Sequence, residues 1–341
     1  MRSEGLALRS GAYVTRPIWL NGSLPTRMWK LPLYVFALLS GGYLGLGVCH
    51  AQNLAPRAYV ITPIHSNALT VTYSFYDGGF QFDAAIPITG ATAKTNITDF
   101  TLYHSFNFFG RSANFTASLP YAVGNFQGEI VGIDRTAYRS GLLPATFRLS
   151  VNLLGGPAMS VQEFAKWQQK TIVGVSFILE PPTGQYDPSR LINYGINRWA
   201  FKPELGFSRR WGHWLLDAYA GAWFFTTNPE YFSHNAVSPG TNTQDESPTG
   251  TFEAHLSYDV RPRFWVSLDG NFWFGGETSV NGVQTPGTVQ RSSRVGVTGS
   301  VPLTNHQSLK FSYSDGAYVQ YGGNYQKLSL AWQYSWFGRP N

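Results

Sequence analysis

The stretch Lys327-Leu-Ser-Leu-Ala-Trp-Gln-Tyr-Ser-Trp336, near the C-terminus, alternates small or polar side chains with leucine and aromatic side chains along ten residues. Successive side chains of a β-strand point to opposite faces, so the large apolar groups share one face and the polar groups share the other. The stretch therefore predicts a strand that lies between an apolar medium and a polar one.

The same period of two recurs along the chain from residue 69 onward. With the stretch quoted above, twelve runs follow the pattern: 69–75, 99–108, 114–121, 147–153, 172–179, 201–208, 216–224, 252–259, 263–274, 294–301, 309–314 and 327–336. Together they predict an all-β fold, a 12-stranded antiparallel transmembrane β-barrel of the bacterial outer membrane.

The connections between the runs alternate in length. Tight links at 109–112, 209–213, 260–263 and 304–307 separate long links at 122–143, 181–198, 227–250 and 275–290. A soluble β-sandwich would also show alternating strands, but short periplasmic turns and long external loops are typical of an outer-membrane barrel. Residues 154–169 are long for a periplasmic link, and we expect one or two helical turns there, either at the membrane edge or as a small plug.

Composition excludes several other classes. The 341 residues include 43% hydrophobic, 16% aromatic and 13% charged residues, with a mean hydropathy of −0.16. Outside residues 31–48 no apolar stretch approaches the roughly 18–20 residues of a membrane-spanning helix. Five of the 25 basic residues and one of the 19 acidic residues lie in residues 1–51, which leaves 20 − 18 = +2 for the rest and predicts no nucleic-acid partner.

The N-terminal region has the plan of an export signal. Met28-Trp-Lys30 provides a positive start, and Leu31–Val48 forms an apolar core. The small residues Cys49 and Ala51 then mark a cleavage site near Ala51. We expect residues 1–51 to be an N-terminal extension and signal peptide, with Met1 or Met28 as the start, and residues 52–341 to form the barrel. The alternative is a buried or membrane-anchoring helix. Cys49 is the only cysteine, so the mature chain would contain no thiol.

If the apolar faces meet lipid, the polar faces line a lumen. The charged residues expected there are Arg148, Lys202, Arg263, Arg294, Lys310 and Lys327, and Asp99, Glu204, Asp217, Glu253, Asp259 and Asp269. His255 and the aromatic residues Tyr103, Tyr219, Trp223 and Trp265 are expected to face inward as well. Six basic and six acidic groups form no ring of one sign that would select ions strongly. Twelve strands predict a narrow bore, because the interior of a barrel of about eight strands is filled by side chains, whereas a barrel of 16–18 strands leaves an open aqueous channel.

Sequence motifs for catalysis or cofactors are not found. No nucleotide-binding, zinc-protease or dinucleotide-binding pattern occurs after residue 51, so we expect no cofactor and no metal. A lipid-modifying enzyme would need a serine nucleophile and a histidine base in contact. Ile64-His-Ser-Asn67 contains these residue types, but neighbouring side chains on an extended chain point to opposite faces. We therefore predict no catalytic residues and a protein that is not an enzyme.

Five segments resemble a known family: Ser150–Ala158, Pro182–Pro188, Leu191–Gly195, Asn197–Gly206 and Ala218–Phe225. They are similar to outer-membrane transporters of the meta pathway of phenol degradation, and the resemblance covers about residues 55–337. The resemblance implies a barrel that passes hydrophobic or aromatic compounds. The family has no established catalytic or binding residues, so the resemblance assigns none to this chain. The residues after Phe337 depart from the pattern of barrels that end on an aromatic residue.

Three hypotheses about function follow. The first is an outer-membrane channel for passive uptake of small, hydrophobic or aromatic solutes. The second is a structural or surface-interaction barrel with a closed lumen, whose partners contact loops such as 227–250. The third is a lipid-modifying enzyme. The expected partners are outer-membrane lipid and lipopolysaccharide, the barrel-insertion machinery and a small-molecule solute.

Overall fold

The computed structural model describes residues 54–81, 88–130, 132–236 and 238–338. The expected signal peptide and its cleavage site lie outside these residues. Twelve strands form the barrel wall: β1 (Ser66–Gln81), β2 (Ile88–Phe108), β3 (Arg111–Ile130), β5 (Thr146–Leu154), β6 (Thr171–Glu180), β7 (Ala200–Trp211), β8 (Trp214–Phe225), β10 (Thr249–Arg261), β11 (Phe264–Gly275), β14 (Gln290–Pro302), β15 (Gln307–Tyr318) and β16 (Gly322–Phe337).

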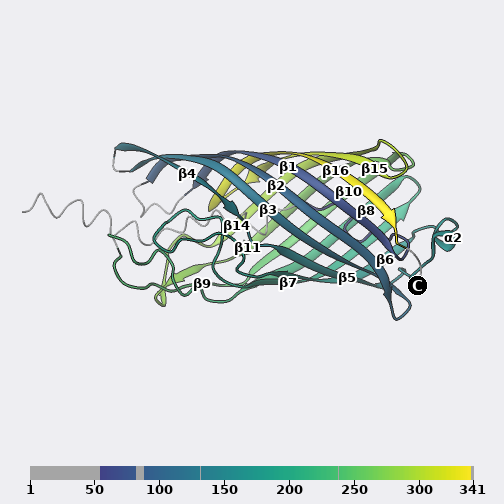
Figure 1. Cartoon of the computed structure of the whole chain (residues 1–341), viewed down its shortest axis with the longest axis horizontal. Coiled ribbons are helices and arrows are strands. Elements are labelled where there is room, and N and C mark those ends of the chain that lie inside the picture. The colour runs from purple at the N-terminus through teal and green to yellow at the C-terminus, as the bar shows by residue number, and fades with distance from the viewer. Residues whose placement is uncertain (1–53, 82–87, 131, 237, 339–341) are drawn as a thin grey trace, which may run out of the picture.

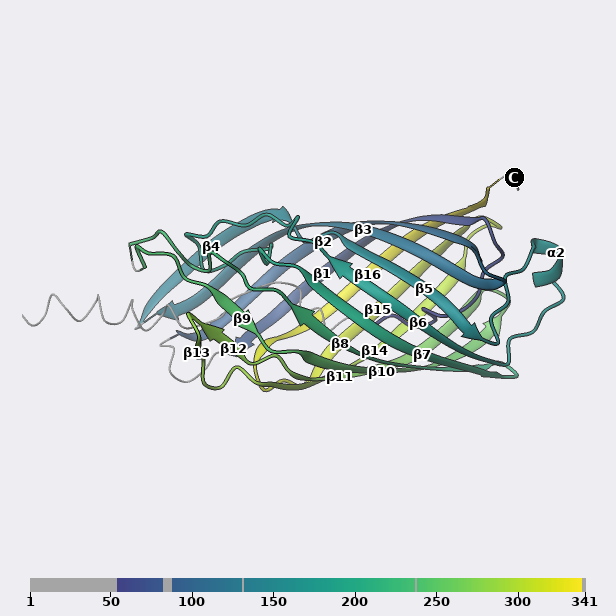
Figure 2. The ribbon, with the colours of Figure 1, turned by 90° about the horizontal axis from the view of Figure 1, so that it is seen from below.

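The sheet is antiparallel throughout and closes on itself. Each wall strand pairs with its neighbours in the sequence, and β1 pairs with β16 from Ser66 opposite Phe337 to Gln81 opposite Gly322. In lipid every backbone N–H and C=O must be paired within the protein, and a closed barrel leaves no free edge. The predicted 12-stranded barrel is confirmed, and the sandwich alternative is excluded by this closure (Figures 1 and 2).

Large apolar side chains cover the outside of the wall. Leu268, Leu102 and Leu330 are each more than half exposed, at 64%, 56% and 51%. The opposite faces of the same strands carry buried serine, threonine and asparagine, such as Ser267 and Ser329. An apolar band of this extent around a closed barrel is the lipid-facing surface of an outer-membrane protein.

The two ends of the barrel differ. The tight turns lie at one end together with the C-terminus and the single helical turn α2 (Val161–Phe164), which Ser160 and Glu163 cap reciprocally (Figure 1). The long connections gather at the other end, where β9 (Gln244–Glu246), β12 (Thr278–Val280) and β13 (Val283–Gln284) form a small separate sheet (Figure 2). Among the described residues no helix is long and apolar enough to span a membrane.

One predicted loop is wrong. Residues 122–143 are not an irregular link, because β3 continues to Ile130 and β4 (Ile133–Leu142) returns along its outer half. In this half the alternation is inverted: Phe126 is buried, whereas Asn125 and Gln127 are exposed. Beyond the bilayer the outside of the wall meets water, so the apolar side chains face inward and the lipid-facing pattern ends.

Replacement of Leu268 by arginine tests which band faces lipid. We expect Leu268→Arg to lower the free energy of folding into phospholipid vesicles by about 2–4 kcal/mol, the cost of arginine near the bilayer midplane. Leu303→Arg, in the turn after β14, should cost about 0–1 kcal/mol. Urea titration followed by tryptophan fluorescence measures both. Equal costs would show that Leu268 does not lie in the bilayer.

Candidate functional site

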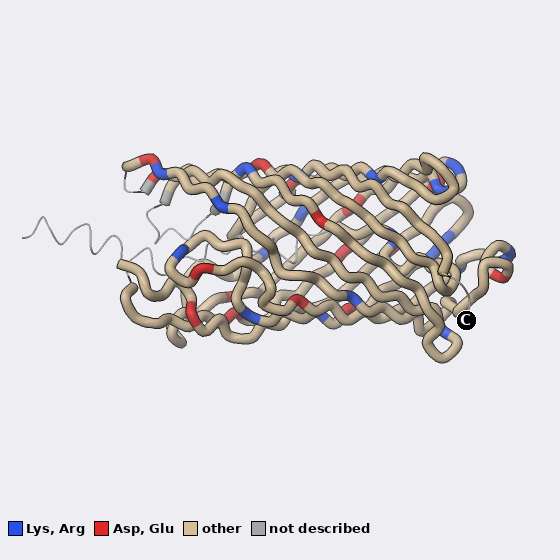
Figure 3. The backbone as a smooth tube through the Cα atoms, viewed as in Figure 1, with Lys and Arg blue, Asp and Glu red and all other residues tan. Residues whose placement is uncertain are grey.

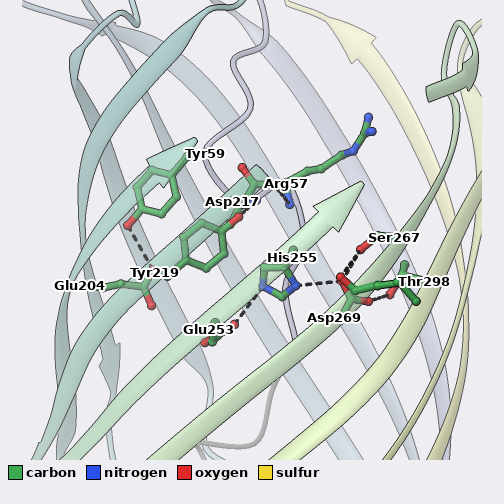
Figure 4. A network of polar contacts seen from close by, with 12 residues as sticks. Arg57, Tyr59, Glu204, Asp217, Tyr219, Glu253, His255, Ser267, Asp269 and Thr298 are labelled. Carbon is green, nitrogen blue, oxygen red and sulfur yellow. Dashed lines mark hydrogen bonds and ion pairs between the residues drawn. The ribbon is translucent and has the colours of Figure 1, made fainter. Parts of the chain in front are cut away.

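The chain passes through the barrel interior before it forms its first strand. Residues 54–65, here called the N-terminal segment, precede β1, and their Tyr59 side chain is fully buried. The backbone N–H of Ala58 donates to the hydroxyl of Tyr219 on β8 (3.0 Å), and the two tyrosine rings lie 5.1 Å apart (Figure 4). Inward side chains of the wall thus satisfy backbone N–H groups at Arg57 and Ala58 that have no strand partner.

Two glycines opposite each other in the wall make room for Tyr59. Gly174 of β6 pairs in register with Gly206 of β7, and a Cβ atom at either position would collide with the Tyr59 ring. At the end of this notch the Tyr59 hydroxyl donates to Glu204 (3.1 Å) and accepts from Ser176 (2.7 Å). Both the shape and the polarity of the wall are therefore matched to this side chain.

Arg57 anchors the segment nearer the periplasmic end. Its guanidinium forms an ion pair with Asp259 (2.6 Å) and lies over the Trp265 ring, 4.3 Å from the centroid. Its backbone N–H donates to the buried carboxylate of Asp217 (3.2 Å). Arg210 also pairs with Asp259. Asp259 thus joins the N-terminal segment to two strands of the wall.

A chain of buried charges continues from Tyr59 across the wall. Glu204 pairs with Arg148 (2.9 Å) and with Lys202 (2.6 Å), and Lys202 lies 3.7 Å from Glu253. The Arg148 guanidinium also stacks over the Tyr59 ring at 5.0 Å. A buried charge is tolerated only when such partners offset its lost hydration.

His255 extends this chain to β11 and β14. Its ring lies 3.5 Å from Glu253 and 2.9 Å from Asp269, and the Thr298 hydroxyl donates to Asp269 (2.6 Å), as does Ser267 (Figure 4). Acidic and basic positions are interspersed along the barrel rather than separated by sign (Figure 3). On β5–β11 the interior is therefore a mutually paired polar surface.

Two further basic residues lie against tyrosines on the other side of the barrel. Arg294 donates to the Ser314 hydroxyl (3.2 Å) and to the Tyr325 carbonyl (2.9 Å), and its guanidinium lies 4.1 Å from the Tyr325 ring centroid. The Lys327 ammonium lies 5.3 Å from the Tyr76 ring. These cation–π contacts partly replace the hydration of the two charges.

The side of the barrel opposite Tyr59 remains accessible. Lys310 is exposed although it pairs in register with inward-facing, buried Ala331. Asp99, which accepts from Thr101 (3.0 Å) and Ser118 (2.6 Å), is partly exposed as well. From Arg57 to Tyr59 the N-terminal segment lies against β6–β11, and farther on it crosses to β2, where Thr62 bonds to Tyr103. Accessible surface remains on β2 at Asp99 and on β15 at Lys310. We call this second surface the open wall.

Apolar side chains narrow both ends of the interior. At the external end Ile196 of the loop 181–199 packs with Trp223 and Trp273 of the wall. At the periplasmic end Ile61 and Met159 pack together, and the segment 154–169 that carries Met159 also bonds to the N-terminal segment through its backbone. Any path through the protein is therefore narrow.

The structure brings most of the expected lumen residues into contact. The residues joined around the N-terminal segment are Arg148, Lys202, Glu204, Asp217, Tyr219, Glu253, His255, Asp259, Trp265 and Asp269. Tyr103 bonds to Thr62 of that segment (2.7 Å). Arg263 was wrongly expected in the lumen: it lies in the turn after β10, has a positive φ of 64°, and donates to the carbonyls of a neighbouring turn.

Sequence reasoning missed the N-terminal segment, including Arg57 and Tyr59. No period of two marks these residues, because the segment is not a strand and has no lipid-facing side. The available signal was the pair Gly174 and Gly206, which interrupts the polar faces of two neighbouring strands. Glycine inside a strand often marks a close approach by another group.

The proposed catalytic pair receives no support from the described residues. His65 and Ser66 bond to backbone and to Ser105, and no hydrogen bond joins a histidine ring to a serine hydroxyl in the described chain. On the outer face His104 bonds to Asn67 (2.7 Å). No cluster of three or more metal-ligating side chains occurs among the described residues.

Filling the glycine notch should displace the N-terminal segment. In Gly206→Leu the new side chain takes the place of the Tyr59 ring, so we expect trypsin to cleave after Arg57 on the order of tenfold faster than in the native protein. Gly299→Leu is the matched control, since its Cβ would have no neighbour closer than 3.9 Å. Fragment mass gives the cleavage rate. Unchanged protection in Gly206→Leu would contradict the notch.

The ion pairs of Glu204 should contribute to stability. Glu204→Gln leaves two buried cations with less compensation, and we expect the free energy of unfolding to fall by about 3–5 kcal/mol. Asp77→Asn, which removes the exposed pair with Lys94, should change it by less than about 1 kcal/mol. Urea unfolding in the same vesicles compares the two. Similar small losses would show that the buried pairs are not coupled to folding.

The fold and the sequence were compared with those of known proteins. An outer membrane channel from Pseudomonas putida F1 has the same fold, with a TM-score of 0.67 at 16% identity over 83% of this chain and 100% of that chain. The transport unit of the autotransporter AIDA-I from Escherichia coli gives a TM-score of 0.47 at 10% identity, over 89% and 98% of the two chains. No curated protein matches the sequence. A family model matches residues 70–331, and the chain belongs to that family, described as "Putative MetA-pathway of phenol degradation".

Proposed function

We propose that the protein is a passive outer-membrane channel for small, hydrophobic or aromatic solutes. The observation that carries this proposal is the open wall: around Tyr59 the N-terminal segment occupies one side of the barrel, and accessible surface remains at Lys310 and Asp99 on the other. The channel of Pseudomonas putida F1 with this fold and the phenol-degradation description of the family support it.

Movement through the channel would consist of weak successive contacts without energy input. Hydroxyl groups such as Thr101 and Ser118 can exchange hydrogen bonds with a solute, and the rings of Tyr76 and Tyr103 offer apolar contact. The charges on the opposite side are paired with one another, whereas the open wall carries Lys310, Lys327 and Asp99. A neutral solute forms no ion pair with any of these groups and is therefore not held tightly.

The closed structural barrel remains a second candidate on one specific observation. Apolar contacts at both ends, made by Ile196 and Ile61, narrow the path. In this alternative the N-terminal segment would seal the barrel permanently.

Further parts of the proposal concern assembly. We propose that residues 1–51 are removed on export near Ala51, as their charged, apolar and small-residue order supports, and that the insertion machinery binds the last strand, β16. Lipopolysaccharide would contact the apolar band at its external edge. We propose no catalytic activity, and Lys202, Glu204 and His255 act here as structural lumen groups.

Liposome swelling separates the two candidates. We expect liposomes that contain the refolded protein to admit pyrogallol, a small hydroxylated ring, faster than empty liposomes, and Gly206→Leu to raise that rate further. Xylitol gives the rate for a solute without a ring. If the native protein and empty liposomes are equal but Gly206→Leu conducts, the closed barrel is correct. If neither conducts, the channel proposal fails.

A further inference from the structure

A pocket of about 340 Å³ lies among the external loops, separate from the surfaces described above. Arg139 and Ser140 of β4 form one side, and residues 185–194 form the other. β4 lies at the end of the barrel opposite α2 (Figure 1). The volume is at the lower end of the range for small-molecule sites. We call it the external pocket.

The loop that forms this pocket is held in a fixed conformation. The backbone N–H of Gln185 donates to the Leu142 carbonyl of β4 (2.7 Å). The side chain of Asn193, which is buried, donates to the carbonyls of Asp187 (3.0 Å) and Arg190 (2.8 Å) and accepts from the Asp187 N–H (2.9 Å). A pocket with such bracing is formed before a ligand arrives, which reduces the entropy cost of binding.

Arg139 carries a positive charge into the pocket that no carboxylate directly offsets. Its guanidinium donates to the carbonyls of Ile192 (3.0 Å) and Tyr138 (2.8 Å), and no acidic side chain of the described chain forms an ion pair with it. The nearby carboxylate of Asp187 is already bonded, to Ser189 and to Arg190 (2.8 Å). The remaining guanidinium N–H groups are available to a ligand.

The electrostatics of the pocket favour an anion. Burial and the charge of Arg190 lower the pKa of Arg139, and hydrogen bonds from Ser189 hold the pKa of Asp187 below its usual value. Two guanidinium groups and one carboxylate give the lining a net charge of 2 − 1 = +1. A bound anion would relieve the repulsion between the two arginines.

The rest of the lining suits a flat apolar group. Tyr186, Pro188, Ile192 and Tyr194 border the same space. The Tyr186 hydroxyl is fixed by hydrogen bonds to Asn228 (2.9 Å) and to the Glu230 carbonyl (3.2 Å), which hold its ring in place. A ring carried beside a carboxylate would satisfy both parts of the pocket, because a guanidinium binds a carboxylate in a bidentate geometry.

We propose that the external pocket binds small aromatic carboxylates, with the carboxylate on Arg139 and the ring between the tyrosine, proline and isoleucine side chains. The pocket captures such solutes on the external side before they enter the barrel. This role rests on the proposed channel function. Binding itself does not, and can be measured without permeation.

Saturation-transfer NMR on the refolded protein in detergent tests the pocket, with benzoate as the ligand. We expect benzoate to bind, benzyl alcohol to bind about tenfold or more weakly, and Arg139→Gln to raise the benzoate Kd about tenfold or more. Arg135→Gln is the matched control, since Arg135 is an exposed residue of β4 that does not line the pocket. Heat-modifiable migration in electrophoresis establishes that each variant is folded.

Four outcomes would overturn the proposal: no binding of benzoate to the native protein, equal binding of benzyl alcohol and benzoate, unchanged binding in Arg139→Gln, or full displacement of benzoate by an equal concentration of inorganic phosphate. The last would identify a general anion site. If the native protein does not bind benzoate but liposomes that contain it still admit pyrogallol, the pocket proposal is rejected and the channel proposal stands. If the native protein binds benzoate but liposomes that contain it do not admit pyrogallol, the channel proposal is rejected and binding in the pocket stands.

Discussion

Within a bilayer an unpaired backbone amide or carbonyl costs several kcal/mol, and the pairing of β1 with β16 removes the last free edge of the sheet. Closure then divides every strand into a lipid face and an interior face. Leu268 and its apolar neighbours can remain exposed only because lipid covers them. The polar residues on the other face are confined to the interior, where they must find partners among themselves.

The N-terminal segment adds further partners for the acidic residues of the wall. Asp217 accepts a hydrogen bond from the backbone N–H of Arg57, and Asp259 forms an ion pair with the guanidinium of the same residue. Glu204 accepts a hydrogen bond from the Tyr59 hydroxyl. The paired glycines 174 and 206 let the Tyr59 ring approach the wall closely enough for these contacts to form together. Because Arg57 and Tyr59 lie on one side of the barrel, the same arrangement that stabilises the interior leaves Lys310 and Asp99 of the open wall accessible.

Beyond the bilayer the outer face of the wall meets water, and the alternation of apolar and polar side chains changes accordingly. β3 continues past the membrane with its apolar residues turned inward, and β4 pairs with it to build one side of the external pocket. The external loops are ordered by their own hydrogen bonds, of which those of Asn193 are an example. The barrel thus carries a second possible ligand surface that is independent of its lumen.

The sequence alone determined the barrel, its strand number and its lipid face, because a period of two is a local property that each strand displays by itself. It also predicted that residues such as Lys202 and His255 lie on polar faces. Only the tertiary structure decided which of them meet, that Arg263 lies in a turn, and that residues 54–65 fold inside. These depend on strand register, closure and the path of an irregular segment, and they join residues as distant as Arg57 and Asp259. No local pattern encodes such contacts, whereas every strand that lies between lipid and the interior must alternate apolar and polar residues.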